Sequence, residues 1–436
     1  MVKNARQVAY EILCRIQKDS SYSNLALDSS LDNSEMSNID KSFTSALVYG
    51  VTERLYTLDF ELSQYLSQPL KKLKPQVLTV LRLGAYQILF MDKIPDSAAI
   101  NESVKLAKKN TMSYASGLVN AVLRKVSTNG LTDTDDMTIK YSAPDWLCKL
   151  WVDSYGKDNA NSLLEATFGS VDTVVRVNTL KTDTDSLISI LALEGITAEK
   201  STITDNALIV RKAGALHKTK AYSDGLFHVQ DTSSQLCCSA LGVTEDDTVL
   251  DVCAAPGGKS FTLCEMLRNF GKVYSFDIYE HRLKLINNGA ERLGINNIVT
   301  FKNDASLHNI NVPMADKILC DVPCAGLGVI RKKPEIRYKR SDEIQKLPDL
   351  QYSILKTSSH YLKVGGTLVY STCSLNPDEN ENVITRFLEE NRNFESVRVL
   401  PDLKRHGDDT DWISLMPHIH GCDGFFIAAV RKIKDV

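Results

Sequence analysis

No run of apolar residues approaches the roughly 18 needed to cross a bilayer, and charged side chains interrupt the apolar positions of the first 19 residues. The 10 cysteines include no CxxC pair and form no regular framework. These absences argue against a membrane or exported protein and favour a reducing cytoplasm. Basic residues do not dominate, since 51 Lys and Arg face 54 Asp and Glu, a net charge of −3. Any surface that binds nucleic acid must therefore be local.

A length of 436 residues predicts roughly three domains of about 150 residues. Residues 1–130 repeat apolar positions at the three-and-four spacing of helices and contain no strand pattern, so we expect an all-α domain there. This segment carries 16 basic and 12 acidic side chains. The excess is a weak indication of RNA contact, and a solvated helical surface is the favoured explanation.

The rest of the chain divides into three parts. Residues 131–144 are mostly polar at their start and are expected to form a linker. Residues 145–230 mix short helix and strand patterns, which predicts a small α+β domain. In residues 231–436, apolar strands alternate with amphipathic helices. That alternation is typical of an α/β domain with a doubly wound, Rossmann-like sheet.

A glycine-containing turn follows the first strand of this last domain. It is made of Cys253, Ala254, Ala255, Pro256, Gly257, Gly258 and Lys259 and leads into a helix. In such sheets ligands bind beyond the carboxyl ends of the strands, where glycines allow close approach and helix N–H groups point outward. The next two strands run into Asp277 and Asp304, which are placed to bind ribose hydroxyls and an adenine edge. We therefore expect a nucleotide-like cofactor.

Two other nucleotide sites compete with this interpretation. Residues 258–260 resemble the end of a phosphate loop, and residues 318–321 would then be its magnesium-binding strand. However, the first glycine that such a loop requires would fall at Cys253. A nicotinamide site is compatible with the fold, but the turn lacks GxGxxG. Both alternatives are disfavoured.

Two further strands end in cysteine-containing turns. Residues 317–320 run into Asp321 and Cys324, and residues 366–370 run into Cys373. Because both turns open onto the same carboxyl edge as the glycine turn, these three side chains should converge. A helix start at Asn376 and a nearby cation such as Lys259 would favour a thiolate at Cys373, as a nucleophile requires. Five other cysteines are interpreted as small hydrophobic residues: Cys14, Cys148, Cys237, Cys238 and Cys264.

Three motifs now stand in order along the chain: CAAPGGK at 253–259, DVPCAG at 321–326 and STCS at 371–374. They closely resemble those of the Sun (RsmB) group of RNA cytosine-5 methyltransferases. The resemblance covers nearly the whole chain, because residues 117–124 resemble the last helix of the NusB-type RNA-binding domain that opens this group. RVNT at 176–179 and DGFF at 423–426 also match. Val322 and Ala325 replace the more usual Ala and Ser, which removes no reactive group.

The resemblance implies S-adenosylmethionine as cofactor, bound by residues 253–259 with Asp277, Asp304 and Asp321. It implies methylation of a cytosine in bacterial 16S rRNA, cytosine 967 in the usual rRNA numbering. The substrate would be the free rRNA or an early small-subunit assembly intermediate. Two alternatives remain. The enzyme could methylate another RNA such as tRNA, or the protein could be a non-catalytic RNA-binding factor, against which the intact cysteine pair argues.

The resemblance also implies the roles of four side chains. Carbon 5 of cytosine is a poor nucleophile, so a thiolate must first add to carbon 6. The family assigns this attack to Cys373 and gives Cys324 a part in the later release. Asp321 would bind the base at N3 and N4, and Lys259 would orient substrate or cofactor. DNA cytosine-5 enzymes instead place the nucleophile in a Pro-Cys motif like residues 323–324.

Two remaining features concern RNA and metal. Residues 331–340 hold six basic side chains and one acidic one, and we expect them to contact phosphate. A target base inside folded RNA must leave its stack, and this run could assist. His418, His420 and Cys422 have a spacing that suggests a metal, but no fourth ligand is evident. We expect no metal.

Overall fold

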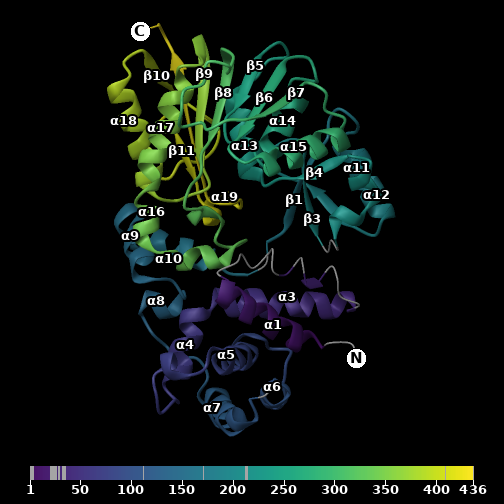
Figure 1. The fold of residues 1–436 in the computed structure, drawn as a ribbon, viewed down its shortest axis with the longest axis vertical. Coiled ribbons are helices and arrows are strands. Elements are labelled where there is room, and N and C mark those ends of the chain that lie inside the picture. The colour runs from purple at the N-terminus through teal and green to yellow at the C-terminus, as the bar shows by residue number, and fades with distance from the viewer. Residues whose placement is uncertain are drawn as a thin grey trace. The chain divides into compact units, whose positions relative to one another are not determined.

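The computed structural model describes residues 4–19, 27, 30–31, 36–110, 112–169, 171–211, 215–407 and 409–435. The chain divides into two compact units. The first unit comprises Met1–Gly169 and Ile330–Lys339, and the second unit comprises Ser170–Val329 and Arg340–Val436. The predicted domain bounds at 130, 144 and 230 do not coincide with this division and stay a prediction. Figure 1 shows the elements of both units.

Every regular element described in the first unit is helical. Its helices are α1 (Ala5–Asp19), α3 (Asn38–Glu53), α4 (Leu55–Ser63), η1 (Leu70–Lys72), α5 (Pro75–Phe90), α6 (Asp96–Lys109), η2 (Ser113–Ala115), α7 (Ser116–Asn129), α8 (Met137–Lys140), α9 (Asp145–Tyr155), α10 (Lys157–Glu165) and η5 (Pro334–Tyr338). The apolar spacing that predicted helices in residues 1–130 is confirmed, because Leu47, Leu58, Val80 and Leu123 are fully buried in one core. The polar segment expected to be a linker contains α8, which Asp136 caps by accepting from Thr138 N.

The second unit contains two sheets. Its elements are β1 (Thr173–Val177), α11 (Thr184–Leu193), β2 (Thr197–Lys200), β3 (Ala207–Arg211), η3 (Leu216–Lys218), α12 (Lys220–Ser223), β4 (Phe227–Val229), α13 (Thr232–Leu241), β5 (Thr248–Asp251), α14 (Gly258–Met266), β6 (Lys272–Asp277), α15 (Glu280–Leu293), β7 (Ile298–Lys302), β8 (Ala315–Asp321), η4 (Leu327–Val329), α16 (Ser341–Ile344), α17 (Leu347–Ser359), β9 (Leu362–Thr372), η6 (Pro377–Glu379), α18 (Glu381–Glu390), β10 (Phe394–Val397), β11 (Ile413–Leu415), α19 (Pro417–His420) and β12 (Phe425–Lys432). The smaller sheet is antiparallel, with the order β2-β3-β1-β4.

The larger sheet has the order β10-β12-β9-β8-β5-β6-β7. Strands β5 to β9 are parallel, and the chain winds outward in both directions from the β5–β8 pair, as a doubly wound sheet requires. β10, β11 and β12 pair antiparallel at one end, so the sheet is mixed rather than purely parallel. The DGFF segment leads into β12, the last of these strands in the chain.

Alternate residues along the strands of this sheet face two different cores. Leu319, Val369 and Ile427 pack with α13, α14 and α15, whereas Ile318 and Leu368 pack with α17 and α18. Because side chains point to opposite faces at every second residue, helices must cover both faces of the sheet. Figure 1 shows these two groups of helices on the sheet. This layering leaves the carboxyl ends of β5 to β9 as the edge where loops can form a site.

The RVNT segment joins the smaller sheet to the larger one. Arg176, at the end of β1, donates through Nε to Glu265 Oε2 on α14 at 2.8 Å, and both side chains are buried. Asn178 donates to the carbonyl of Leu293, at the end of α15, also at 2.8 Å. These two buried contacts connect β1 and the residue after it to α14 and α15, so they fix the small sheet against the helices of the larger one.

Candidate active site

The glycine turn follows β5 and begins α14. Gly257 has φ +111°, and a Cβ there would lie 2.5 Å from the ring of Phe261, so only glycine fits. Asp251, at the end of β5, is buried and accepts from the Ser260 hydroxyl at 2.6 Å. Burial raises the pKa of Asp251 to about 7. The turn is thus held closely against the strand end, with the N-terminus of α14 at its exit.

Three carboxylates lie around this turn at the ends of neighbouring strands. Asp277 ends β6, Asp304 comes two residues after β7, and Asp321 ends β8, while β5 lies between β6 and β8. Asp277 Oδ1 accepts from the N–H of Tyr279 and Asp304 Oδ1 from that of Ser306, which fixes both side chains. A row of acceptors beside a glycine turn fits a ligand that carries ribose hydroxyls, an amino-substituted base and an ammonium group.

A buried donor also faces the turn. The Nε2 atom of Gln230 has no hydrogen-bond partner among the described residues, while its Oε1 accepts from Thr262. This nitrogen is 3.8 Å from the position that a Cβ would occupy at Gly258. An unpartnered buried amide is costly, so its position beside the glycine turn is consistent with a ligand that accepts its hydrogen bond.

Lys259 and Asp321 form an ion pair at this edge, with Nζ 2.7 Å from Oδ2. The hydroxyl of Ser371 donates to the other oxygen of Asp321 at 3.0 Å. Burial alone would lower the pKa of Lys259, but the Asp321 carboxylate more than offsets this, so the pKa lies above its ordinary value and the amine stays charged. The ammonium group also lies 5.1 Å from the ring centroid of Phe425 in the DGFF segment. The ion pair therefore fixes the position of the Asp321 carboxylate, while an effect of Lys259 on the Cys373 thiol stays a prediction.

The two cysteines Cys324 and Cys373 meet, with 3.2 Å between their sulfur atoms. The Cys324 turn is fixed by Gly328, whose N–H donates to the carbonyl of Cys373 at 2.9 Å. A Cβ at Gly328 would lie 1.9 Å from the carbonyl oxygen of Gly424, so the close approach of the DGFF segment requires glycine. The hydrogen bond with Cys373, together with burial, raises the pKa of Cys324 well above its ordinary value. Cys324 is therefore a neutral thiol that can donate to the Cys373 sulfur.

The sequence-predicted site residues thus gather at one edge of the larger sheet. Lys259 and Asp321 are in contact, Cys324 and Cys373 are in contact, and Ser371 links Asp321 to the turn that carries Cys373. Asn376 caps η6 by accepting from Asp378 N, as predicted. Of the cysteines interpreted as hydrophobic, Cys148, Cys237, Cys238 and Cys264 are buried and Cys14 is partly buried.

Two polar side chains beside the cysteines were not identified from the sequence. Glu379 and Gln351 are both completely buried, and they bond to each other and to the cysteine turns. Glu379 follows the STCS motif within the capped turn that the sequence did predict. In the sequence, an acid at this position is typical of the first turn of a helix. Only the packing of α17 and η6 against the cysteine turns shows that Glu379 is buried between them.

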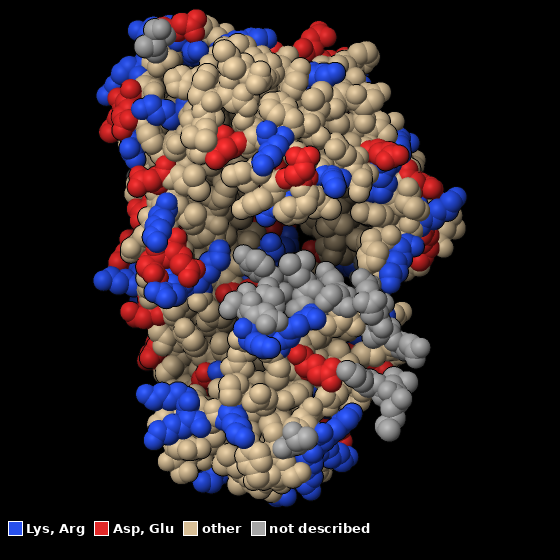
Figure 2. Space-filling view, viewed as in Figure 1, with Lys and Arg blue, Asp and Glu red and all other residues tan. Residues whose placement is uncertain are grey.

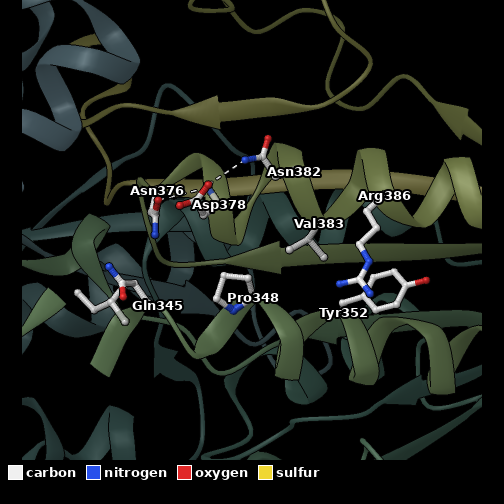
Figure 3. A pocket seen from close by; sticks show the side chains of 9 residues that line it. Gln345, Pro348, Tyr352, Asn376, Asp378, Asn382, Val383 and Arg386 are labelled. Atoms are coloured by element: carbon white, nitrogen blue, oxygen red, sulfur yellow. Dashed lines mark hydrogen bonds between the residues drawn. The ribbon is translucent and has the colours of Figure 1, made fainter. Parts of the chain in front are cut away.

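A pocket of about 290 Å³ lies beside the same turn, between α16, α17 and α18 (Figure 3). It is lined by Ile344, Gln345, Pro348, Tyr352, Asn376, Asp378, Asn382, Val383 and Arg386. Arg386 lies over the ring of Tyr352 and pairs with Asp349 and Glu390. Because its charge is already compensated, the pocket presents no strong anion site.

The basic run 331–340 differs from its expected role at one position. Arg337 is buried and donates to the carbonyls of Glu53, Tyr141 and Thr167 within the first unit. The prediction that the Arg337 side chain contacts phosphate is therefore wrong. The run itself contains exposed Arg331 and Lys333, for which phosphate contact stays a prediction. Figure 2 shows acidic and basic side chains interspersed over the face in view.

The described residues show neither a cluster of metal ligands nor a helix that could cross a membrane. In the described part of the chain, no group of three His, Cys, Asp or Glu side chains could hold a metal ion. Within the His418, His420, Cys422 trio, the ring of His420 bonds to main-chain atoms of Met416 and Lys404. None of the described helices combines the length and the apolar character needed to cross a bilayer.

Family models match three consecutive stretches of this chain. Residues 3–128 match the NusB family, residues 143–217 match the ferredoxin-like domain of RsmF/B-like methyltransferases, and residues 238–431 match the 16S rRNA methyltransferase RsmB/F model. These matches agree with the helical N-terminal part, the small antiparallel sheet and the larger mixed sheet.

Curated relatives and solved structures are also similar to this chain. A probable ribosomal RNA small subunit methyltransferase B of Bacillus subtilis is 37% identical over 98% of this chain and 99% of its own length. The crystal structure of the protein PH0851 superposes with a TM-score of 0.85 at 25% identity and covers 99% of this chain and 100% of its own. NSun6 from Pyrococcus horikoshii, solved with the S-adenosylmethionine analogue SFG, shares the fold with a TM-score of 0.61 at 24% identity over 67% of this chain and 99% of its own.

Proposed function

The chain belongs to the RsmB/F family of S-adenosylmethionine-dependent 16S rRNA methyltransferases, and we propose that it methylates carbon 5 of a cytosine in 16S rRNA. The observation that carries the carbon-5 assignment is the pair of thiols, whose sulfur atoms are 3.2 Å apart at the cofactor edge of the sheet. Methyl transfer to a nitrogen or oxygen needs no sulfur nucleophile. Methyl transfer to carbon 5 needs a nucleophile that adds to carbon 6, and a second group that helps this nucleophile to leave afterwards.

In this proposal Cys373 begins the reaction. Its thiolate adds to carbon 6 of the base, so that the C5–C6 electrons become available at carbon 5. The S–H of Cys324 stabilises the attacking sulfur by donating to it. When bound, S-adenosylmethionine supplies an electrophilic methyl group. The residues that would hold it are those of the glycine turn together with Asp277, Asp304 and Asp321.

Asp321 would bind the ring while charge develops on it. Its carboxylate is fixed on one side by Lys259 and on the other by Ser371. An acceptor held in this way needs no reorganisation when the base enters, which is where electrostatic catalysis gains most. We assign to Asp321 the acceptance of hydrogen bonds from the N4 amino group and from N3, which takes a proton from solvent as charge develops on the ring, and to Lys259 the orientation of Asp321 and of the substrate.

Once the adduct has formed, Cys324 would give its proton to solvent and, as a thiolate, remove the proton from carbon 5. The C5–H electrons then restore the C5–C6 double bond while the C6–S bond breaks and Cys373 leaves as a thiolate. Before the reaction, the largest cause of the raised pKa of Cys324 is its hydrogen bond to Cys373. In the adduct the Cys373 sulfur is bonded to carbon, so this cause disappears. The pKa of Cys324 then falls at the step where a base is needed.

We further propose that residues 1–130 and 145–230 help to place the RNA, and that residues 231–436 perform the reaction. A ribosomal substrate implies that the enzyme acts in the cytoplasm, on free 16S rRNA or on an early small-subunit assembly intermediate. A tRNA substrate would use the same chemistry. A non-catalytic RNA-binding role would leave the paired thiols without a purpose.

Transfer of labelled methyl tests this function. Unmodified 16S rRNA, an early small-subunit particle and tRNA are each incubated with the enzyme and labelled S-adenosylmethionine, and the modified base is mapped. We expect 5-methylcytosine at one cytosine of the rRNA. Label only in tRNA would refute the target and keep the chemistry. Label on a ring nitrogen or on ribose would refute carbon 5.

Asp277→Ala is expected to weaken S-adenosylmethionine binding by about 10–100-fold, because charge-assisted hydrogen bonds contribute roughly 1.5–3 kcal/mol. Titration calorimetry on the enzyme without RNA measures this directly. The matched control is Asp246→Ala, which changes an exposed aspartate that comes just before β5. Equal affinity of both variants and the wild type would exclude Asp277 from the cofactor site.

A further inference from the structure

Glu379 is a fully buried acid that the mechanism above does not use. Its two carboxylate oxygens bond to different parts of the site. Oε2 accepts from the N–H of Ala325 at 2.7 Å and from the side-chain amide of Gln351 at 2.9 Å. Oε1 accepts from the hydroxyl of Ser374 at 2.7 Å and from the amide of Asn376 at 3.2 Å.

The donors on each oxygen identify what the carboxylate connects. Ala325 directly follows Cys324, and Gln351 also donates to the carbonyl of Pro323, which precedes it. Ser374 directly follows Cys373. One oxygen of Glu379 therefore binds the turn that carries the first thiol, and the other binds the turn that carries the second.

We propose that Glu379 is a positioning residue, which holds the turns of Cys324 and Cys373 at the separation that the reaction requires. The inference rests on the proposed function for its chemical meaning, but the bridge between the turns is independent of it. A buried carboxylate is costly unless several donors compensate it. Here four donors do so, and all of them come from these two turns or from Gln351, which is itself bonded to one of them.

A second consequence concerns Cys324. The Glu379 carboxylate is one of the groups that raise the pKa of this thiol, after the hydrogen bond with Cys373 and burial. Glu379 would thus help to keep a proton on Cys324 until the adduct has formed. Because reacting atoms must be aligned closely, a shift of about 1 Å in either turn can lower the rate on the order of 100-fold.

Two substitutions distinguish the effect of the length of the Glu379 side chain from the effect of its charge. Glu379→Asp keeps the charge but shortens the side chain by one carbon, about 1.5 Å, so the carboxylate cannot reach both turns. Glu379→Gln keeps the length but replaces an acceptor by a donor and removes the charge. Glu389→Asp is the matched control, since Glu389 is exposed on α18. Ser374→Ala removes a single donor and serves if the Glu379 variants fold poorly.

The first measurement uses the free protein and needs no substrate. Alkylation of Cys324 and Cys373 by iodoacetamide is followed by peptide mass spectrometry across pH 6–10. We expect both thiols to react at least about tenfold faster in the Glu379 variants, and the Cys324 profile of Glu379→Gln to move to lower pH, because a negative charge is lost. Glu389→Asp should match the wild type. Unchanged rates in the Glu379 variants would overturn the bridge, whatever the enzyme methylates.

The second measurement reports on the reaction. RNA carrying 5-fluorocytosine traps the adduct, because fluorine cannot leave carbon 5 as a proton does. We expect Glu379→Asp to slow adduct formation by about 100-fold and Ser374→Ala by about tenfold, with S-adenosylmethionine affinity within about twofold. Adduct formation at the wild-type rate in either variant would overturn the positioning role. A wild type that forms no adduct would instead refute the proposed function, while the alkylation result still decides the bridge.

Discussion

Cys373→Ala is expected to abolish both the covalent RNA adduct and methyl transfer, with a loss on the order of 10⁴-fold or more, as for other nucleophile deletions. Cys324→Ala is expected to form the adduct and transfer the methyl group but to stall there, with release slowed by roughly 100-fold or more. The reason is the geometry of the pair. The two sulfur atoms are in contact, and the raised pKa of Cys324 keeps a proton on it while Cys373 attacks.

Denaturing gel electrophoresis of enzyme with labelled rRNA distinguishes the two variants, since a stalled adduct migrates above the free protein. Cys14→Ala is the control, because this cysteine lies on α1 of the first unit. If Cys324→Ala prevents adduct formation and Cys373→Ala permits it, the roles of the two thiols are exchanged. Turnover at the wild-type rate in either variant would remove that thiol from the mechanism.

Arg337→Met is expected to lower the free energy of unfolding of the first unit by about 3–5 kcal/mol. The guanidinium donates to three main-chain carbonyls and to the Thr167 hydroxyl and lies 4.8 Å from the ring centroid of Phe168. Methionine fills a similar volume but leaves these buried acceptors without a donor, at a cost of roughly 1–3 kcal/mol for each unsatisfied group. Urea unfolding followed by tryptophan fluorescence measures the change, because Trp146 and Trp151 lie on α9 of the same unit.

Lys333→Met is the control for this substitution, since Lys333 is exposed in the same run and should change stability by less than about 0.5 kcal/mol. For the salt dependence of RNA affinity we expect the reverse order, with the larger effect from Lys333→Met. Loss of one phosphate contact at Lys333 should reduce the slope by about one, whereas Arg337→Met should leave it unchanged in the folded protein. A reduced slope for Arg337→Met with full stability would restore its predicted contact with phosphate.

The sequence by itself determined the elements and the inventory of the site. The helical spacing in residues 1–130, the alternation after residue 231 and the positions of Asp277, Asp304, Asp321, Cys324 and Cys373 at strand ends are all local patterns. Local patterns suffice because the 3.6-residue and two-residue periods of helices and strands are set by the backbone. Parallel strands then bring their carboxyl ends to one edge without further information.

The tertiary structure decided which side chains bear the charges and hydrogen bonds of the site. Arg337 belongs to a run of basic residues and yet is buried, because segment 330–339 packs into the helical unit. Lys259 forms an ion pair with Asp321, which lies 62 residues further along the chain. Glu379 looks like a first-turn acid and instead joins the two cysteine turns. Burial and partner choice depend on contacts between residues far apart in the chain, and no local pattern contains them.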